Sequence, residues 1–163
     1  MNDAHIHLLV NHVPTIGQVI GFAVFLAGLF LKNETVKRTG AAIILFAAAA
    51  VFAASMSGER AEEMVEGMAG MNGNLIHDHE EAGEAAVTGG IVSAALALLY
   101  LLAAWKRPGF TRIISWLMIP AIAVSIFLLA QASTKGGLIR HPEIGSGVQS
   151  VQSNGGEQGE DND

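Results

Sequence analysis

The 163-residue sequence contains no cysteine. This absence excludes disulfides, thiolate metal sites, iron–sulfur clusters and catalysis by a thiol. Several motifs are missing as well: the Glu-x-x-His pair of di-iron bundles, His-Glu-x-x-His, Cys-x-x-Cys-His, a phosphate-binding glycine loop and the nucleophile elbow. No basic surface points to nucleic acid as a partner. The remaining pattern gives no case for an enzyme, apart from a possible redox activity.

Charge is scarce within four long stretches of the chain, and hydrophobic residues make up 51% of the whole. A bilayer core needs about 20 apolar residues of helix to cross it. The pattern therefore predicts an all-α integral membrane protein, a bundle of four transmembrane helices. The third span should be the membrane part of a helix that begins near Leu75. The predicted spans cover, approximately, residues 8–31, 39–55, 85–105 and 113–132.

Lysine and arginine are distributed unevenly among the segments that connect these spans. The short loops after spans one and three carry most of them, whereas the other side carries only Arg60, Lys135 and Arg140. Because basic loops tend to stay in the cytoplasm, we expect a multi-pass protein of the bacterial inner membrane with both termini on the extracytoplasmic side. The basic loop residues are Lys32, Lys37, Arg38, Lys106, Arg107 and Arg112.

The segment from Gly58 to Gly70 separates apolar from acidic residues on a helical wheel. This pattern predicts a short extracytoplasmic amphipathic helix between spans two and three, lying over the bundle as a lid. Methionines in this segment and just after it recur at helical spacing. Thioethers are ligands that suit Cu(I), but adaptable packing beneath a lid would use the same residues. These methionines are Met64, Met68 and Met71.

The chain divides into a transmembrane domain, residues 1–144, and a tail, residues 145–163. Small residues in the first part, such as Gly17 and Gly21 in span one, should let the helices pack closely. The tail is polar and ends in acidic residues, with too little apolar surface to offset the entropy of ordering. We therefore expect a disordered acidic tail.

All six histidines fall toward the predicted extracytoplasmic end of the bundle. Three segments that are distant in sequence supply them, and the bundle must bring the ends of those segments together. Imidazole is the commonest metal ligand and also ligates haem iron. The pattern predicts a metal or haem site at this end, although interfacial histidines can also be merely hydrated. The histidines are His5, His7, His12, His77, His79 and His141.

His79 shares one face of its predicted helix with small residues, namely Gly83, Ala86 and Gly90. This face would supply an axial imidazole and room for a flat macrocycle, with His12 opposite it on span one. The leading hypothesis is a haem b site in a b-type cytochrome-like electron-transfer protein or accessory subunit. Its predicted cofactor-binding residues are His12, His79, His7, Gly83 and Gly90.

His77 lies on a different, acidic face together with Glu81. Such a face favours a cation, so the second hypothesis is a protein that binds and handles copper or zinc. A third is a structural subunit of a larger membrane complex without a cofactor. Besides the lipid bilayer, possible partners are a membrane redox complex or a periplasmic electron carrier, and the oligomeric state stays open. The predicted metal ligands are His5, His7, His77, Glu81 and His141.

The first predicted helix opens with the string HIHLLVNHVPTIG. It resembles the first helix of a group of uncharacterised bacterial four-helix membrane proteins, which commonly opens with a pattern like His-Pro-Leu-Leu-Val-His-Phe-Pro. His7 and His12 match the two histidines of that pattern and Pro14 its later proline, whereas Leu8 stands in place of the first proline. The strings GERAEE, HDHEEAG and GGLIRHPEI look like recurrent features of similar proteins. The resemblance implies a four-helix membrane unit with histidines at one end.

Overall fold

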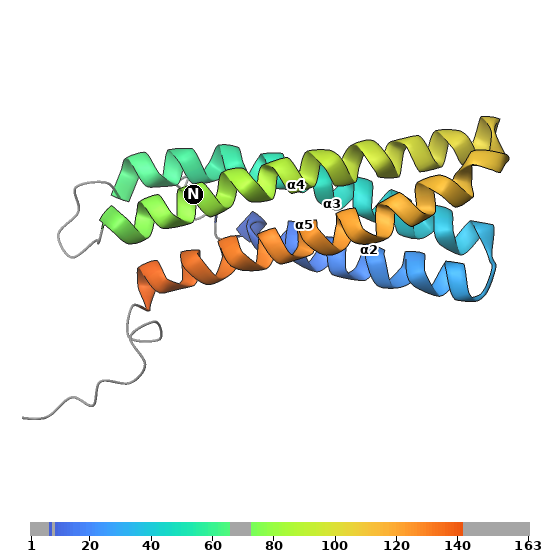
Figure 1. Ribbon diagram of the computed structural model, residues 1–163. Coiled ribbons are helices and arrows are strands. Elements are labelled where there is room, and N and C mark those ends of the chain that lie inside the picture. The colour runs from blue at the N-terminus through green and yellow to red at the C-terminus, as the bar shows by residue number, and fades with distance from the viewer. Residues whose placement is uncertain (1–6, 8, 66–72, 142–163) are drawn as a thin grey trace, which may run out of the picture.

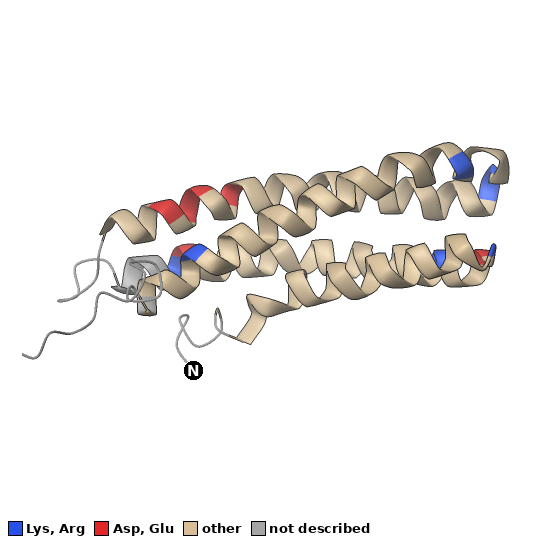
Figure 2. Ribbon diagram, turned by 60° about the horizontal axis from the view of Figure 1, so that its bottom comes forward, with Lys and Arg blue, Asp and Glu red and all other residues tan. Residues whose placement is uncertain are grey.

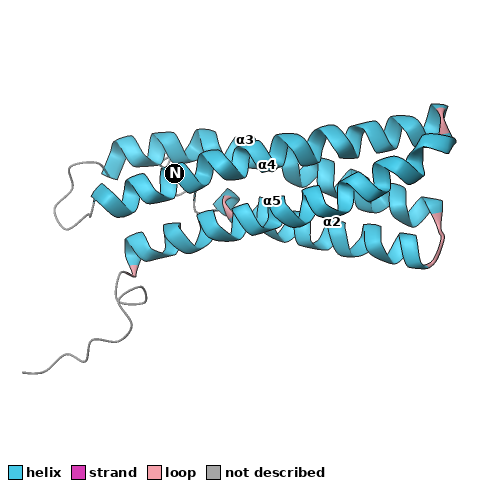
Figure 3. Cartoon of the chain, in the orientation of Figure 1, coloured by secondary structure: helices cyan, strands magenta, loops and turns pink. Residues whose placement is uncertain are grey.

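A computed structural model describes residue 7 and residues 9–65 and 73–141, and within these residues it contains helices and no strand (Figures 1 and 3). The tail at 145–163, His5, Met68 and Met71 lie outside the described residues. The helices are α2 (His12–Phe30), α3 (Glu34–Val65), α4 (Gly73–Lys106), the short 3-10 turn η1 (Pro108–Phe110) and α5 (Thr111–Arg140).

The four long helices confirm the predicted number of apolar segments. Each is long and apolar enough to cross a membrane, with a mean hydropathy between 1.9 and 2.5 over its most apolar window. Only 28% to 33% of each window is buried within the protein. Large apolar side chains such as Phe46, Trp116 and Phe127 point outward with 60% or more of their surface exposed. Such an apolar exterior is what a helix bundle presents to lipid rather than to water.

Several helices extend beyond the apolar stretches that predicted them. α3 continues to Val65, so residues 58–65 are its last turns and not part of a separate helix lying across the bundle. The rest of the predicted lid, residues 66–70, lies outside the described residues. α4 begins at Gly73, close to the predicted start near Leu75, and α5 continues past its apolar stretch to Arg140. Hydropathy locates the apolar part of such helices but not their polar ends.

The helices form two hairpins, α2–α3 and α4–α5, which pack side by side (Figure 1). Within each hairpin the helices are in close contact, and α3 also packs along α4. The contact between α2 and α5 is much sparser, and α2 and α4 occupy diagonal positions. Figure 2 shows acidic residues along the beginning of α4 and basic residues at the opposite end, where each hairpin turns.

The two hairpins repeat one another in their buried positions. His7 and His79 are separated by a fixed number of residues. The same number separates every buried residue of α2 from a buried residue of α4. A second constant offset relates buried residues of α3 to those of α5. The matched pairs on α2 and α4 are Pro14 and Ala86, Gln18 and Gly90, Gly21 and Ser93, Phe25 and Ala97, and Gly28 and Tyr100; those on α3 and α5 include Gly40 and Met118, Ile44 and Ile122, Ala47 and Ser125, and Val51 and Leu129.

Equivalent helix contacts support this relation. A Cβ atom added at Gly17 would lie 2.8 Å from the Cβ of Ala47, and one added at the matching Gly89 would lie 3.1 Å from the Oγ of the matching Ser125. Small residues thus set the approach of the two helices at the same level in both hairpins. Because α2 and α4 run in the same direction on diagonal corners, the bundle has an approximate two-fold axis along its length.

Candidate functional site

His7 and His79 occupy equivalent positions in the two hairpins, and their side chains meet. The ring centroids are 6.4 Å apart and the ring planes are inclined by 70°. His7 lies one turn before α2 and is joined to it by a bond from the Asn11 amide to the His7 carbonyl, 2.9 Å long. His79 belongs to the second turn of α4. The pair therefore joins the residue one turn before α2 to α4, at the end opposite the hairpin turns.

Each imidazole is held by a backbone carbonyl of the neighbouring helix. Nδ1 of His7 lies 3.1 Å from the carbonyl oxygen of Ala54, and Nδ1 of His79 lies 2.9 Å from that of Ala132. A carbonyl oxygen can only accept, so Nδ1 carries the proton in both rings. Nε2 of each ring then bears the free lone pair, which is the state required of a metal ligand.

Ser57 completes the hydrogen bonds around His7. Its hydroxyl donates to the carbonyl oxygen of Ala54 over 2.9 Å, and its Oγ lies 3.2 Å from Nδ1 of His7. Since the hydroxyl proton is already directed to the carbonyl, Oγ accepts from the imidazole. The orientation of His7 is thus fixed by two acceptors, in the manner of the outer hydrogen bonds that orient metal-ligating histidines.

Both rings rest against a glycine one helical turn beyond the carbonyl that binds them. A Cβ atom added at Gly58 would lie 3.2 Å from Cε1 of His7, and one added at Gly136 would lie 2.9 Å from Cε1 of His79. Ala54 and Gly58 on α3 match Ala132 and Gly136 on α5 by the same offset as the buried residues. The two histidines are therefore anchored in the same way on either side of the approximate axis.

A further polar atom is buried one turn after His7 in the sequence. Asn11 follows His7 by one turn, and its side-chain Oδ1 is buried without a hydrogen-bond partner among the residues the structure describes. An unpaired buried amide oxygen costs about 1–3 kcal/mol. The cost would be offset if water or a bound molecule donated a hydrogen bond there.

Only some of the residues named by the haem hypothesis lie at the histidine pair. His79 takes part in the pair, but its neighbouring ring is that of His7, while His12 is exposed. The small-residue groove is partly filled: a Cβ at Gly90 would meet Val51 of α3 at 3.1 Å, whereas one at Gly83 would have nothing within 4 Å. Close helix packing thus accounts for Gly90.

Of the residues in the predicted His/Glu metal site, His5 lies outside the described residues and His7 belongs to the pair with His79. His77 is exposed and faces Glu80 and Glu81 of its own helix, with nitrogen–oxygen distances of 3.5 and 3.6 Å. His141 is exposed at the end of α5. Among the described residues there is no group of three or more His, Cys, Asp or Glu side chains that could hold an ion.

Sequence reasoning missed the anchors of the pair. The signal for them is a repeated pattern: His-x-His occurs at residues 5–7 and 77–79, and Ala-Ser-x-x-Gly occurs from Ala54 and again from Ala132. Aligning the two occurrences would have paired His7 with His79 and would have singled out Gly58 and Gly136.

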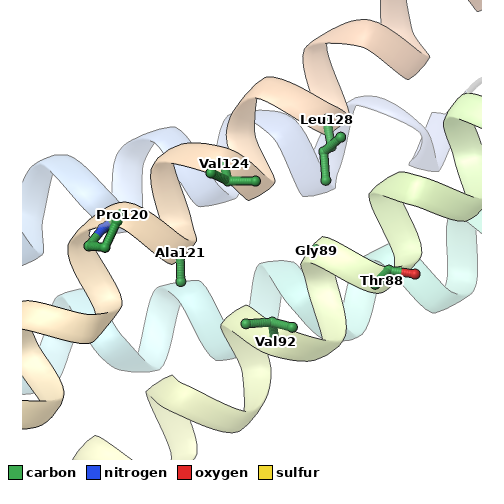
Figure 4. A pocket seen from close by; sticks show the side chains of 7 residues that line it. All are labelled: Thr88, Gly89, Val92, Pro120, Ala121, Val124 and Leu128. Atoms are coloured by element: carbon green, nitrogen blue, oxygen red, sulfur yellow. The ribbon is translucent and has the colours of Figure 1, made fainter.

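An apolar groove lies elsewhere, on the outer side of α4 and α5 (Figure 4). Its volume is about 380 Å³. Gly89 and Pro120 lie at its border and leave the space between the helices unfilled. Its one hydroxyl, that of Thr88, already donates to the carbonyl oxygen of Glu84 over 3.1 Å. The groove offers apolar surface and no free polar group, so it has no evident chemistry.

Comparison of the chain with protein-family models, curated proteins and solved structures finds no match. The resemblance of the first helix to a group of bacterial membrane proteins therefore stays a prediction.

Proposed function

We propose that this chain is a multi-pass membrane protein that binds haem b between His7 and His79 and serves electron transfer. The observation that carries the proposal is the equivalent anchoring of the two imidazoles by Ala54 and Ala132 on either side of the bundle axis. Each ring has its Nδ1 proton committed to a carbonyl, so each presents Nε2 as a ligand. His7 and His79 would hold the haem iron through these nitrogens, and the haem would supply the redox chemistry.

The spacing of the rings is consistent with a single iron between them. If both rings held one ion through Nε2, with metal–imidazole bonds of about 2 Å, their ring centres would lie no more than about 6 Å apart. The observed centroid separation is 6.4 Å. Haem also suits a site with two protein ligands, because the macrocycle supplies the other four. The absence of a three-ligand group in the described residues favours haem over a closed zinc site.

A copper ion is the second candidate, and one observation favours it. Val51 fills the space beside Gly90, which narrows the room for a macrocycle along α4. Cu(I) accepts two imidazoles without further ligands and needs no such room, as a soft ion that histidine and methionine both bind. The third candidate, a structural subunit of a larger complex, would use the pair only for helix packing.

The proposed orientation places the histidine pair on the extracytoplasmic side of the bacterial inner membrane. It is supported by the position of the basic residues at the two hairpin turns, the end away from His7 and His79 (Figure 2). A haem there would exchange electrons with a periplasmic carrier or with a membrane redox complex.

The absorption spectrum of the protein tests the proposal. Protein purified in mild detergent from haem- and copper-replete cells should show a Soret band and one haem per chain. His7→Ala and His79→Ala should each remove most of it, whereas His77→Ala, which alters an exposed histidine of the same helix, should leave it intact. Stoichiometric copper without a Soret band would select the second candidate. If wild-type protein carries neither, the pair is structural.

A further inference from the structure

A cleft opens between α2 and α5 at the end opposite the histidine pair. It measures about 680 Å³ and combines apolar walls with charged residues at its mouth. Leu26, Leu29 and Ile119 contribute apolar surface, and Trp116 lies at the rim with 68% of its surface exposed. The charged residues are Lys32, Glu34, Lys37 and Arg112.

The equivalent interface of the other pair of helices, between α3 and α4, is closed by two hydrogen bonds. The hydroxyl of Tyr100 donates to a carboxylate oxygen of Glu34 over 3.1 Å, and the guanidinium of Arg38 donates to the carbonyl oxygen of Ala104 over 2.7 Å. Both bonds link the two hairpins at the level of their turns. They explain why α3 and α4 remain in contact there.

The approximate two-fold axis relates this closed interface to the open cleft, and the residues that close the first are replaced in the second. The sequence relation between the hairpins matches Gly28 of the open cleft with Tyr100 of the closed interface. It likewise matches Arg112 of the cleft with Glu34 of the closed interface. Lys32 of the cleft corresponds to Ala104, and Trp116 of the cleft corresponds to Arg38. Gly28 has no side chain that could reach the neighbouring helix. The matched partner position holds basic Arg112 in the cleft, whereas it holds acidic Glu34 in the closed interface. The cleft therefore has space and positive charge where its counterpart has a tyrosine and a carboxylate.

The positive charge of the cleft is not balanced within the described part of the protein. Glu34 pairs with Lys37 and accepts from Tyr100. Lys32 and Arg112 have no ion pair or side-chain hydrogen bond among the described residues. Lys32 is also held in place by the backbone, since it adopts φ of 50° in the turn, with the Asn33 amide bonded to the Gly28 carbonyl over 2.9 Å.

We propose that this cleft binds an anionic phospholipid. The phosphate group would lie between Lys32 and Arg112, and an acyl chain would follow Leu26 and Ile119 between α2 and α5. Arginine and lysine at the membrane interface bind phosphate strongly because of charge-assisted hydrogen bonds, and basic pockets between transmembrane helices are known to take acidic headgroups. The lipid would supply, between α2 and α5, the link that Tyr100 and Glu34 supply between α3 and α4. This inference rests on the proposed membrane embedding but not on haem.

Native mass spectrometry of the protein in detergent, titrated with phosphatidylglycerol or phosphatidylcholine, tests the inference. We expect one phosphatidylglycerol to be retained with at least tenfold preference. Arg112→Gln and Lys32→Gly should each weaken it by about tenfold. Lys32→Gly is informative because glycine relieves the left-handed backbone, so the fold should persist. The matched control is Lys135→Gln at the other end of the bundle, which should change nothing.

Three outcomes would overturn the inference: equal binding of the two lipids, an equal loss in Lys135→Gln, or displacement of phosphatidylglycerol by millimolar inorganic phosphate, which would indicate a site for free anions. Flotation of the protein with vesicles tests the proposed membrane embedding by itself. A failure of the lipid site can therefore be told apart from a failure of the embedding. The absorption spectrum of Arg112→Gln should match the wild type, because the histidine pair lies at the opposite end.

Discussion

Gly136 of α5 lies directly against the imidazole of His79. A Cβ atom at this position would come within 2.9 Å of Cε1 and 3.3 Å of Nε2 of that ring. Real Cβ atoms essentially never approach so closely, and the ring is also held by its bond to the Ala132 carbonyl. The position of His79 thus depends on the absence of one methyl group on the neighbouring helix.

Gly136→Ala should therefore displace the His79 ring and reduce occupancy of the proposed site at least tenfold, with little change in helix content. Gly137→Ala is the matched control, since a Cβ there meets nothing within 4 Å. The control should keep full occupancy and gain about 0.5–1 kcal/mol of stability from the higher helix propensity of alanine. Haem or copper per chain is the measurement. Equal occupancy in the two variants would show that His79 is not a ligand.

The helices themselves were predictable because long apolar stretches leave a clear trace in hydropathy. The ends of α3 and α5 were not, because their final turns are polar and resemble loops or amphipathic segments. Residues 58–65 are an example. A helical wheel of these residues separates polar from apolar side chains, and this pattern is the same for a straight continuation of α3 and for a separate helix lying across the bundle.

The histidine pair was predictable only in part. The helical wheel placed His79 on the small-residue face of α4, and that face is indeed turned into the bundle, as buried Ala82 and Ala86 show. It could not choose between His12, the first residue of α2, and His7, which lies one turn before that helix. That choice depends on how far α2 is rotated, which is set by the contact of Gly17 with Ala47 and of Gly21 with Ile44.

The orientation of the bundle is open to a direct test. We expect an alkaline phosphatase fusion after Gly73 to be active and one after Lys37 to be inactive, because the enzyme works only outside the cytoplasm. Gly73 begins α4 at the histidine end, and Lys37 lies in the first turns of α3 at the basic end. A green fluorescent protein fused at the same two sites should give the reverse pattern. Phosphatase activity after Lys37 alone would place the histidines inside the cell.

Some polar side chains are buried inside the apolar bundle. Gln18 of α2, Ser93 of α4 and Ser125 of α5 are completely buried. Their side-chain polar atoms have no hydrogen-bond partner within the described residues, and for Gln18 this includes both amide atoms. Gln18 is matched in the other hairpin by Gly90, so the repeat does not require an amide here.

Gln18→Met should therefore stabilise the protein. Methionine has a similar length and no polar atom that needs a partner, so the variant removes an unpaired buried amide at a gain of about 1–3 kcal/mol. The measurement is the thermal midpoint in detergent, and Gln131→Met on the exposed side of α5 is the control, expected to stay within about 0.5 kcal/mol of wild type. A lower midpoint for Gln18→Met would contradict this account, because it would mean that the amide is satisfied, most simply by an internal water held with Ser93 or Ser125.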